Sequence, residues 1–172
     1  MNYLTQFRES IDNPESFWKR QSEKIDWFKA PKTILSQDEN GFYRWFSGGR
    51  LNTCHLALDI HVAKGRGNQP ALIYDSPVTE TKRSYSYTEL LDETSRFSGV
   101  LKNLGVVKGD RVVIYMPMVP ELPVTMLACA RIGAVHSVVF GGFSADSLAD
   151  RIADSTCTTL VTCNGTHRGD KP

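Results

Sequence analysis

The sequence predicts an α/β fold with a parallel sheet, on three observations from its second half. Val112–Tyr115 and Ala134–Phe140 are short apolar runs whose composition is typical of buried strands. Met126–Ile132 between them is rich in helix formers, with regular helix expected from about Glu121, and Gly133 follows at the position of a C-cap glycine. Two buried strands joined by one helix form a βαβ unit, in which the strands are parallel.

A third β-branched run, Thr158–Cys163, extends this pattern. We expect a helix before it, from Ala145 to about Ala153, with Ser144 as its N-cap. The spacing predicts three parallel strands joined by right-handed crossover helices. No helix follows the third run to cover its face, so the sequence has the character of a truncated domain.

The elements before the sheet follow the same logic. Ala71–Tyr74 and Ser84–Tyr87 are predicted strands, joined by a loop that contains proline and several hydroxyl residues. Ser86 and Glu89 have the spacing of a capping box, which predicts a helix that ends at Gly105.

The first 60 or so residues differ in composition from the rest of the chain, because they contain all three tryptophans and few β-branched runs. Asn13 as N-cap and Pro14 at the first position predict a helix start. We expect little regular structure around the aromatic clusters Lys24–Phe28 and Phe42–Phe46, and a further helix at Leu51–Val62.

The composition of the chain narrows the possible functional classes of the protein. The chain has 172 residues, 41% of them hydrophobic and 23% charged, with a net charge of +1, so nothing in it predicts binding to nucleic acid or to a membrane. The start of the chain lacks the apolar core of a signal peptide, and no Cys-x-x-Cys pair occurs. We therefore expect a cytoplasmic protein with four reduced cysteines. A metal site from Cys54, His55 and His61 is not favoured, and Asp59 with these histidines is interpreted as a polar helix face.

The end of the second predicted strand is the candidate site. Gly141 and Gly142 fall at the carboxyl edge of the sheet, where open α/β folds bind ligands, and a helix N-terminus follows them. The pair serves either to let a ligand approach the backbone or simply to make a tight turn. A Rossmann dehydrogenase is not predicted, because no Gly-x-Gly-x-x-Gly follows a strand.

Four segments carry a resemblance to a known family. Trp45–Asn52, Lys108–Val112, Tyr115–Glu121 and Met126–Phe143 are similar to short-chain acyl-CoA synthetases, the acetyl-CoA and propionyl-CoA synthetases of the AMP-forming, adenylate-forming enzymes. The resemblance implies an acetyl-CoA-synthetase-type N-terminal segment over residues 1–62. It further implies an incomplete first part of the AMP-binding domain over residues 63–172.

Within this group, Thr53–His55 and Ala71–Thr79 look more like propionyl-CoA synthetases. The resemblance implies a two-step ligase, in which ATP and a short carboxylate give an acyl-adenylate and CoA then gives the thioester. CoA, ATP and Mg²⁺ are therefore expected for the full-length parent. The family's phosphate loop, its later binding segments and its catalytic lysine are absent from this sequence, so no residue here is assigned as catalytic and the fragment itself is expected to be inactive.

The resemblance does assign part of a CoA site. Phe140, Gly141 and Gly142 correspond to the turn beside the CoA nucleotide. A short basic run that meets the CoA phosphates maps to Arg168, Gly169, Asp170 and Lys171. Asp170 stands where the family has glycine and places a negative charge beside the expected phosphate. Partners are then the small-molecule substrates and the remainder of the same polypeptide. The alternative is a standalone, non-catalytic module that binds a nucleotide, CoA or another protein.

Overall fold

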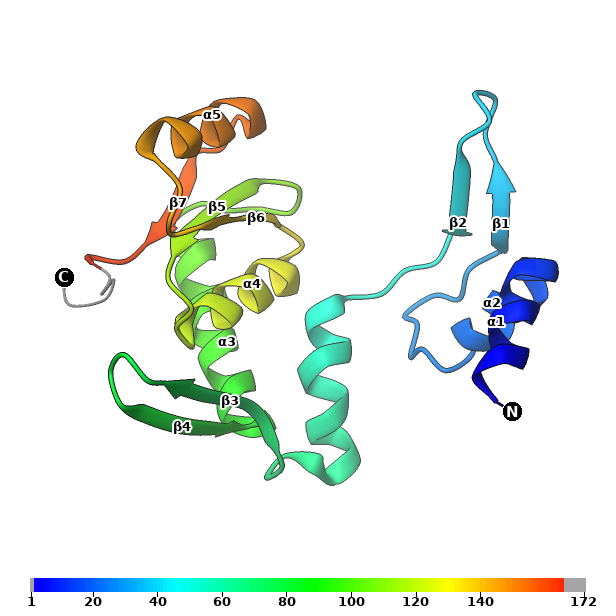
Figure 1. Cartoon of the computed structure of the whole chain (residues 1–172), viewed down its shortest axis with the longest axis horizontal. Coiled ribbons are helices and arrows are strands. Elements are labelled where there is room, and N and C mark those ends of the chain that lie inside the picture. Colours follow the sequence, from blue (N-terminus) through cyan, green and yellow to red (C-terminus); the bar gives the residue numbers. More distant parts are fainter. Residues whose placement is uncertain (1, 166–172) are drawn as a thin grey trace. The chain divides into compact units, whose positions relative to one another are not determined.

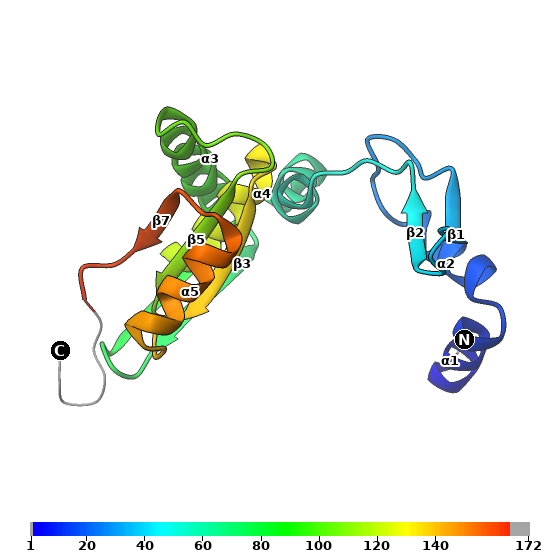
Figure 2. The ribbon, with the colours of Figure 1, turned by 90° about the horizontal axis from the view of Figure 1, so that it is seen from above.

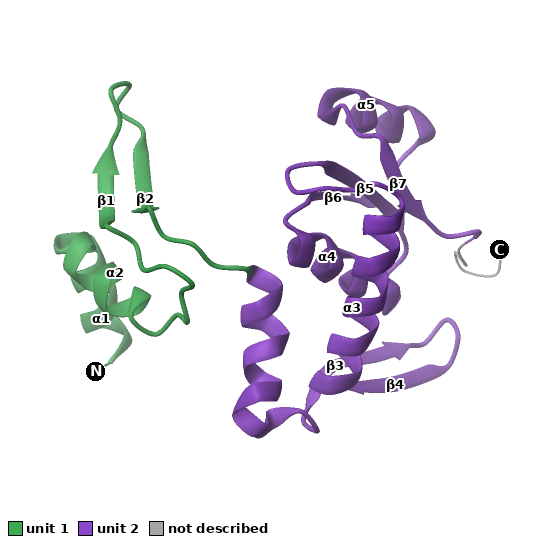
Figure 3. Cartoon of the chain, turned by 180° about the vertical axis from the view of Figure 1, so that it is seen from behind, with its two compact units in different colours: residues 1–52 green, residues 53–172 purple. Residues whose placement is uncertain are grey.

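The computed structural model describes residues 2–165. The chain divides into two compact units, Met1–Asn52 and Thr53–Pro172, which are described separately (Figure 3). Among the described residues, no helix is long and apolar enough to cross a membrane.

The N-terminal unit contains two helices, α1 (Tyr3–Asp12) and α2 (Pro14–Ser22). The expected helix start at Pro14 is confirmed, but Asn13 does not cap it through its side chain. The backbone N–H of Asn13 instead donates to the carbonyl of Glu9 and closes α1, so one residue is shared by two helix ends. With a φ of −137° and a ψ of 61°, Asn13 lacks the extended backbone of an ideal N-cap.

The expectation of little regular structure around Phe42–Phe46 was wrong. β1 (Thr33–Gln37) and β2 (Tyr43–Ser47) form an antiparallel hairpin. Asp38 accepts hydrogen bonds from the backbone N–H groups of Asn40 and Phe42, both at 3.0 Å. Gly41 has a φ of 79°, so the Asn-Gly dipeptide was the local signal for this hairpin.

The C-terminal unit begins with a helical segment. The helix predicted at Leu51–Val62 is present, but it is largely π-helical, in η1 (His55–Asp59) and η2 (Val62–Arg66). The antiparallel hairpin of β3 (Pro70–Ser76) and β4 (Thr81–Ser86) follows, and then α3 (Tyr87–Asn103). Buried side chains of the π-helical segment, β4 and α3 form one apolar cluster, made up of Cys54, Leu58, Tyr85 and Leu90.

The capping box predicted for α3 is confirmed. The hydroxyl of Ser86 accepts from the backbone N–H of Glu89 at 3.2 Å, and the Glu89 carboxylate accepts from the backbone N–H of Ser86 at 2.8 Å. The Glu89 carboxylate also accepts from the Ser86 hydroxyl at 2.8 Å, and the two bonds it accepts lower the pKa of Glu89 below its ordinary value, the bond from the Ser86 backbone contributing most. Two N–H groups that the helix leaves unpaired are therefore satisfied.

We expect Ser86→Ala to lower the free energy of unfolding by about 0.5–2 kcal/mol, because an N-cap acceptor is lost. Because the folded carboxylate has a lowered pKa, the Glu89 contribution is present above the unfolded pKa and is lost as pH falls through the folded one. Urea unfolding followed by circular dichroism measures the change. Ser95→Ala in the same helix, where the hydroxyl only bonds the Leu91 carbonyl, is the control and should change stability little.

The three predicted parallel strands are confirmed. β5 (Arg111–Met116) pairs in parallel with β6 (Val135–Phe140) and with β7 (Thr159–Thr162), in the order β6-β5-β7. α4 (Glu121–Ile132) joins the first two strands, and α5 (Ala145–Ser155) leads to the third. α3 and α4 lie on one side of this sheet and α5 on the other (Figures 1 and 2).

The core of this unit lies between the central strand and the two helices beneath it. Val112 and Ile114 of β5 are fully buried in a cluster that also holds Leu101 of α3 and Ala128 of α4. Gly133 ends α4 in the left-handed region with a φ of 78°, as its predicted role as C-cap requires. Because the three strands are parallel, their carboxyl ends lie at one edge of the sheet.

Candidate nucleotide-binding turn

The candidate site follows β6 at the carboxyl edge of the sheet. Phe140 ends the strand and Ser144 caps α5, so residues 140–144 form a strand-to-helix turn. The Ser144 hydroxyl accepts from the backbone N–H of Ser147 at 3.3 Å, and the backbone N–H of Phe143 donates to the Phe140 carbonyl at 3.0 Å. One hydrogen bond thus closes the turn between Phe140 and Phe143, and the other joins the end of the turn to α5.

Two aromatic rings stand on this turn. Phe140 is 67% exposed, and its ring meets that of Phe143 edge to face, with centroids 6.0 Å apart and planes at 85°. The guanidinium of Arg151 in α5 lies 4.8 Å from the centroid of the Phe143 ring. The face of an exposed aromatic ring can stack on a nucleotide base whatever the base is.

The two glycines have different steric surroundings. A Cβ on Gly142 would lie 2.6 Å from a ring carbon of Phe140, so the ring occupies the space that any other residue would fill. A Cβ on Gly141 would lie 3.5 Å from the Met116 carbonyl oxygen, which is ordinary contact. A side chain at position 142 would therefore displace the Phe140 ring from its place over the turn.

Tyr115 of β5 contacts the turn through its hydroxyl group. No pattern in the sequence predicted a role for this residue. Its hydroxyl lies 3.2 Å from the carbonyl oxygen of Gly141 and 3.0 Å from that of Phe143. The Tyr115 carbonyl in turn accepts from the hydroxyl of Thr162 in β7, at 2.7 Å. Tyr115 directly follows the aliphatic residues Val112–Ile114. A tyrosine hydroxyl next to a buried aliphatic run needs a polar partner, and this need is the only signal in the sequence for the contact.

The basic run from Arg168 to Lys171, predicted to meet the CoA phosphates, lies outside the described residues. Its assignment therefore stays a prediction from the sequence.

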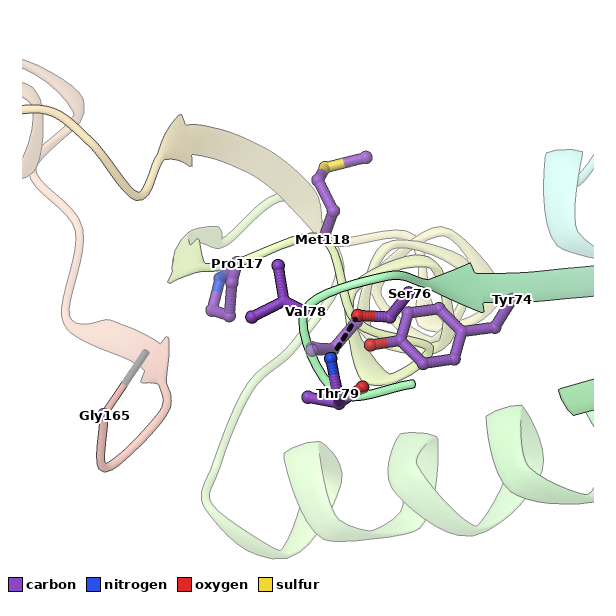
Figure 4. Close-up of a pocket in the computed structure, with 8 residues that line it drawn as sticks. Tyr74, Ser76, Val78, Thr79, Pro117, Met118 and Gly165 are labelled. Carbon is purple, nitrogen blue, oxygen red and sulfur yellow. Dashed lines mark hydrogen bonds between the residues drawn. The ribbon is translucent and has the colours of Figure 1, made fainter. Parts of the chain in front are cut away.

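A pocket of about 250 Å³ opens at the same edge. It lies between the β3–β4 loop, the segment after β5 and the end of β7 (Figure 4). The backbone N–H of Thr79 donates to the hydroxyl of Ser76 at 3.3 Å, and Gly165 lies on the opposite side from Tyr74 in this view. The lining is mostly apolar and consists of Tyr74, Ser76, Val78, Thr79, Pro117, Met118, Val119 and Gly165.

Asp59 of the π-helical segment forms an ion pair with a residue of α4. Arg131 of α4 donates to both carboxylate oxygens of Asp59, at 2.8 and 3.0 Å, and its guanidinium also lies 3.6 Å from the sulfur of Cys54. Hydrogen bonds to Asp59 raise the pKa of Arg131, and burial raises the pKa of the Cys54 thiol. A buried thiol with a raised pKa is a poor nucleophile and a poor metal ligand.

His61 lies apart from this pair, against the ring of Tyr87 and the guanidinium of Arg66. Within residues 2–165, no three His, Cys, Asp or Glu side chains are grouped so that they could hold a metal ion. The interpretation of Asp59 as part of a satisfied polar face therefore agrees with its contacts.

Comparison with known proteins identifies the family. A family model described as AMP-binding enzyme matches residues 60–171. The chain belongs to this family. A second model, described as acetyl-coenzyme A synthetase N-terminus, matches residues 3–57. The two matched segments therefore follow each other along the chain, while the boundary predicted at residue 62 stays a prediction.

The chain is similar to several curated proteins. The chain is 50% identical over 165 residues to an acetyl-coenzyme A synthetase of Campylobacter jejuni and 46% identical over 171 residues to one of Desulfatibacillum aliphaticivorans. It is 46% identical over 162 residues to the human acyl-CoA synthetase short-chain family member 3, mitochondrial. These alignments cover 95%, 98% and 94% of this chain but only 25%, 26% and 24% of the relatives. The chain thus spans about a quarter of their length.

Proposed function

We propose that this chain is the N-terminal part of an AMP-forming short-chain acyl-CoA ligase, which converts propionate or acetate, ATP and CoA to acyl-CoA, AMP and pyrophosphate. The observation that carries the proposal is the succession of the two family matches, which together extend from residue 3 to residue 171. Propionate is our preferred substrate, because Thr53–His55 and Ala71–Thr79 resemble propionyl-CoA synthetases. We expect the enzyme to work in the cytoplasm.

Within this proposal the turn after β6 binds the nucleotide of CoA. Phe140 offers an exposed ring for the adenine base, and its close packing on Gly142 keeps that ring at the sheet edge. Arg168 and Lys171 would pair with the phosphates, since charge-assisted contacts of this kind suit a phosphate oxygen. Asp170 opposes them by its charge.

ATP and Mg²⁺ belong elsewhere in the proposed enzyme. The sequence has no phosphate loop, and residues 2–165 hold no group of side chains that fits a metal ion. We therefore assign adenylate formation to the remainder of a longer polypeptide.

The experiment compares the 172-residue chain with the protein encoded by the longest open reading frame that contains it. We expect carboxylate-dependent exchange of pyrophosphate into ATP only with the longer protein, and faster exchange with propionate than with acetate. Exchange above background by the 172-residue chain would contradict its predicted inactivity. If the reading frame ends with this chain and it binds CoA without exchange, the alternative of a non-catalytic binding module replaces the ligase.

A further inference from the structure

We propose that Tyr115 is a positioning residue for the nucleotide of CoA, acting through the turn that carries Phe140. The inference rests on the proposed function, and it adds a residue that the family resemblance did not assign. Tyr115 does not itself face the ligand in this proposal. It fixes the backbone on which the stacking ring stands.

The Tyr115 hydroxyl lies close to two parts of the turn. It lies within hydrogen-bond distance of two carbonyl oxygens, those of Gly141 and Phe143, which are separated by one residue of the turn. Its single proton can be donated to one of them at a time or shared between both, so the hydroxyl can restrain the turn at either carbonyl. Both carbonyls would otherwise have to find other donors at the sheet edge.

Tyr115 is itself held by both neighbouring strands. It lies in the central strand, paired in register with Val139 of β6 and Thr162 of β7. Thr162 also donates its hydroxyl to the Tyr115 carbonyl at 2.7 Å. A tyrosine anchored in this way transmits the position of the sheet to the turn.

The ring that Tyr115 would position is that of Phe140. Phe140 is 67% exposed, so few contacts restrain it besides Gly142 beneath it and Phe143 beside it. Phe143 is in turn held by the bond from Tyr115 to its carbonyl and by the Arg151 guanidinium over its ring. A ring that is already ordered loses less conformational entropy when it stacks on a base.

The test is Tyr115→Phe in the full-length ligase, with adenosine 3′,5′-bisphosphate, the nucleotide half of CoA, as competitive inhibitor. We expect the KM for CoA and the Ki for the bisphosphate to rise together by about threefold to tenfold, which corresponds to the cost of ordering one side chain. The kcat at saturating CoA should stay near its wild-type value. Tyr43→Phe, which removes the same oxygen from an exposed strand residue, is the matched control and should leave both constants unchanged.

A double mutant separates positioning from a general loss of stability. Because Tyr115 acts through Phe140, Tyr115→Phe should add no further increase in Ki in a Phe140→Leu background. Independent, additive losses would overturn the inference, as would a rise in KM without a rise in Ki, or no change in either.

Failure of the proposed function has a different signature. A wild-type protein that forms no acyl-CoA would refute the ligase itself. A wild-type ligase that the bisphosphate does not inhibit in competition with CoA would leave the ligase intact and refute the positioning role of Tyr115.

Discussion

We expect Ile114→Ala to lower the free energy of unfolding of the C-terminal unit by about 2–5 kcal/mol. Ile114 is fully buried in the central strand, with β6 on one side and β7 on the other, and its side chain packs in the cluster beneath the sheet. Truncation removes buried methyl groups and leaves a cavity that the surrounding strands and helices cannot easily fill.

Two spectroscopic signals distinguish the unfolding of the two units. All three tryptophans lie in the N-terminal unit, so their fluorescence follows that unit during urea unfolding. Circular dichroism follows the C-terminal unit as well, and its transition should move to lower urea in Ile114→Ala. The tryptophan transition should move less.

Val138→Ala is the surface control for Ile114→Ala. Val138 is the register partner of Ile114 in β6, but it is 43% exposed, so its truncation to alanine should have a much smaller effect. Ile114→Val should cost about 0.5–1.5 kcal/mol, because only one methylene is removed. Equal losses for Ile114→Ala and Val138→Ala would contradict the burial pattern of this sheet.

In the full-length protein, Arg168→Ala should raise the apparent KM for CoA and leave adenylate formation nearly intact. The family resemblance assigns Arg168, which follows the third strand in the sequence, to a CoA phosphate. A charge-assisted pair of this kind contributes about 1.5–3 kcal/mol, which corresponds to about a tenfold to hundredfold weaker interaction. Because Asp170 brings a negative charge into the same basic run, we expect the loss at the lower end of that range.

Pyrophosphate exchange and thioester formation, measured side by side in the Arg168→Ala variant, test this expectation. Arg8→Ala, in an exposed position of α1, controls for the loss of one positive charge. Equal losses in both half-reactions would make Arg168 a structural residue. No loss in either would make it a solvated charge without contact to CoA.

The sequence by itself determined the elements whose signals are local. β-branched runs predicted β5, β6 and β7, and helical segments between such runs predicted the parallel arrangement that the register confirms. Ser86 with Glu89, and Gly133, predicted one helix start and one helix end. Each of these depends on residues a few positions apart, which is why a pattern along the chain contains the information.

The tertiary structure alone decided the contacts between distant segments. The Tyr115 hydroxyl bonds carbonyls 26 and 28 positions further along the chain, and Arg131 bonds Asp59 from 72 positions away. The ring of Phe140 fills the space left by Gly142, a packing detail that the glycine pair did not reveal. Periodicity can show that a residue belongs to a strand or a helix. Which side chain meets which backbone atom depends on how those elements pack, and that is settled only once the sheet and its helices are assembled.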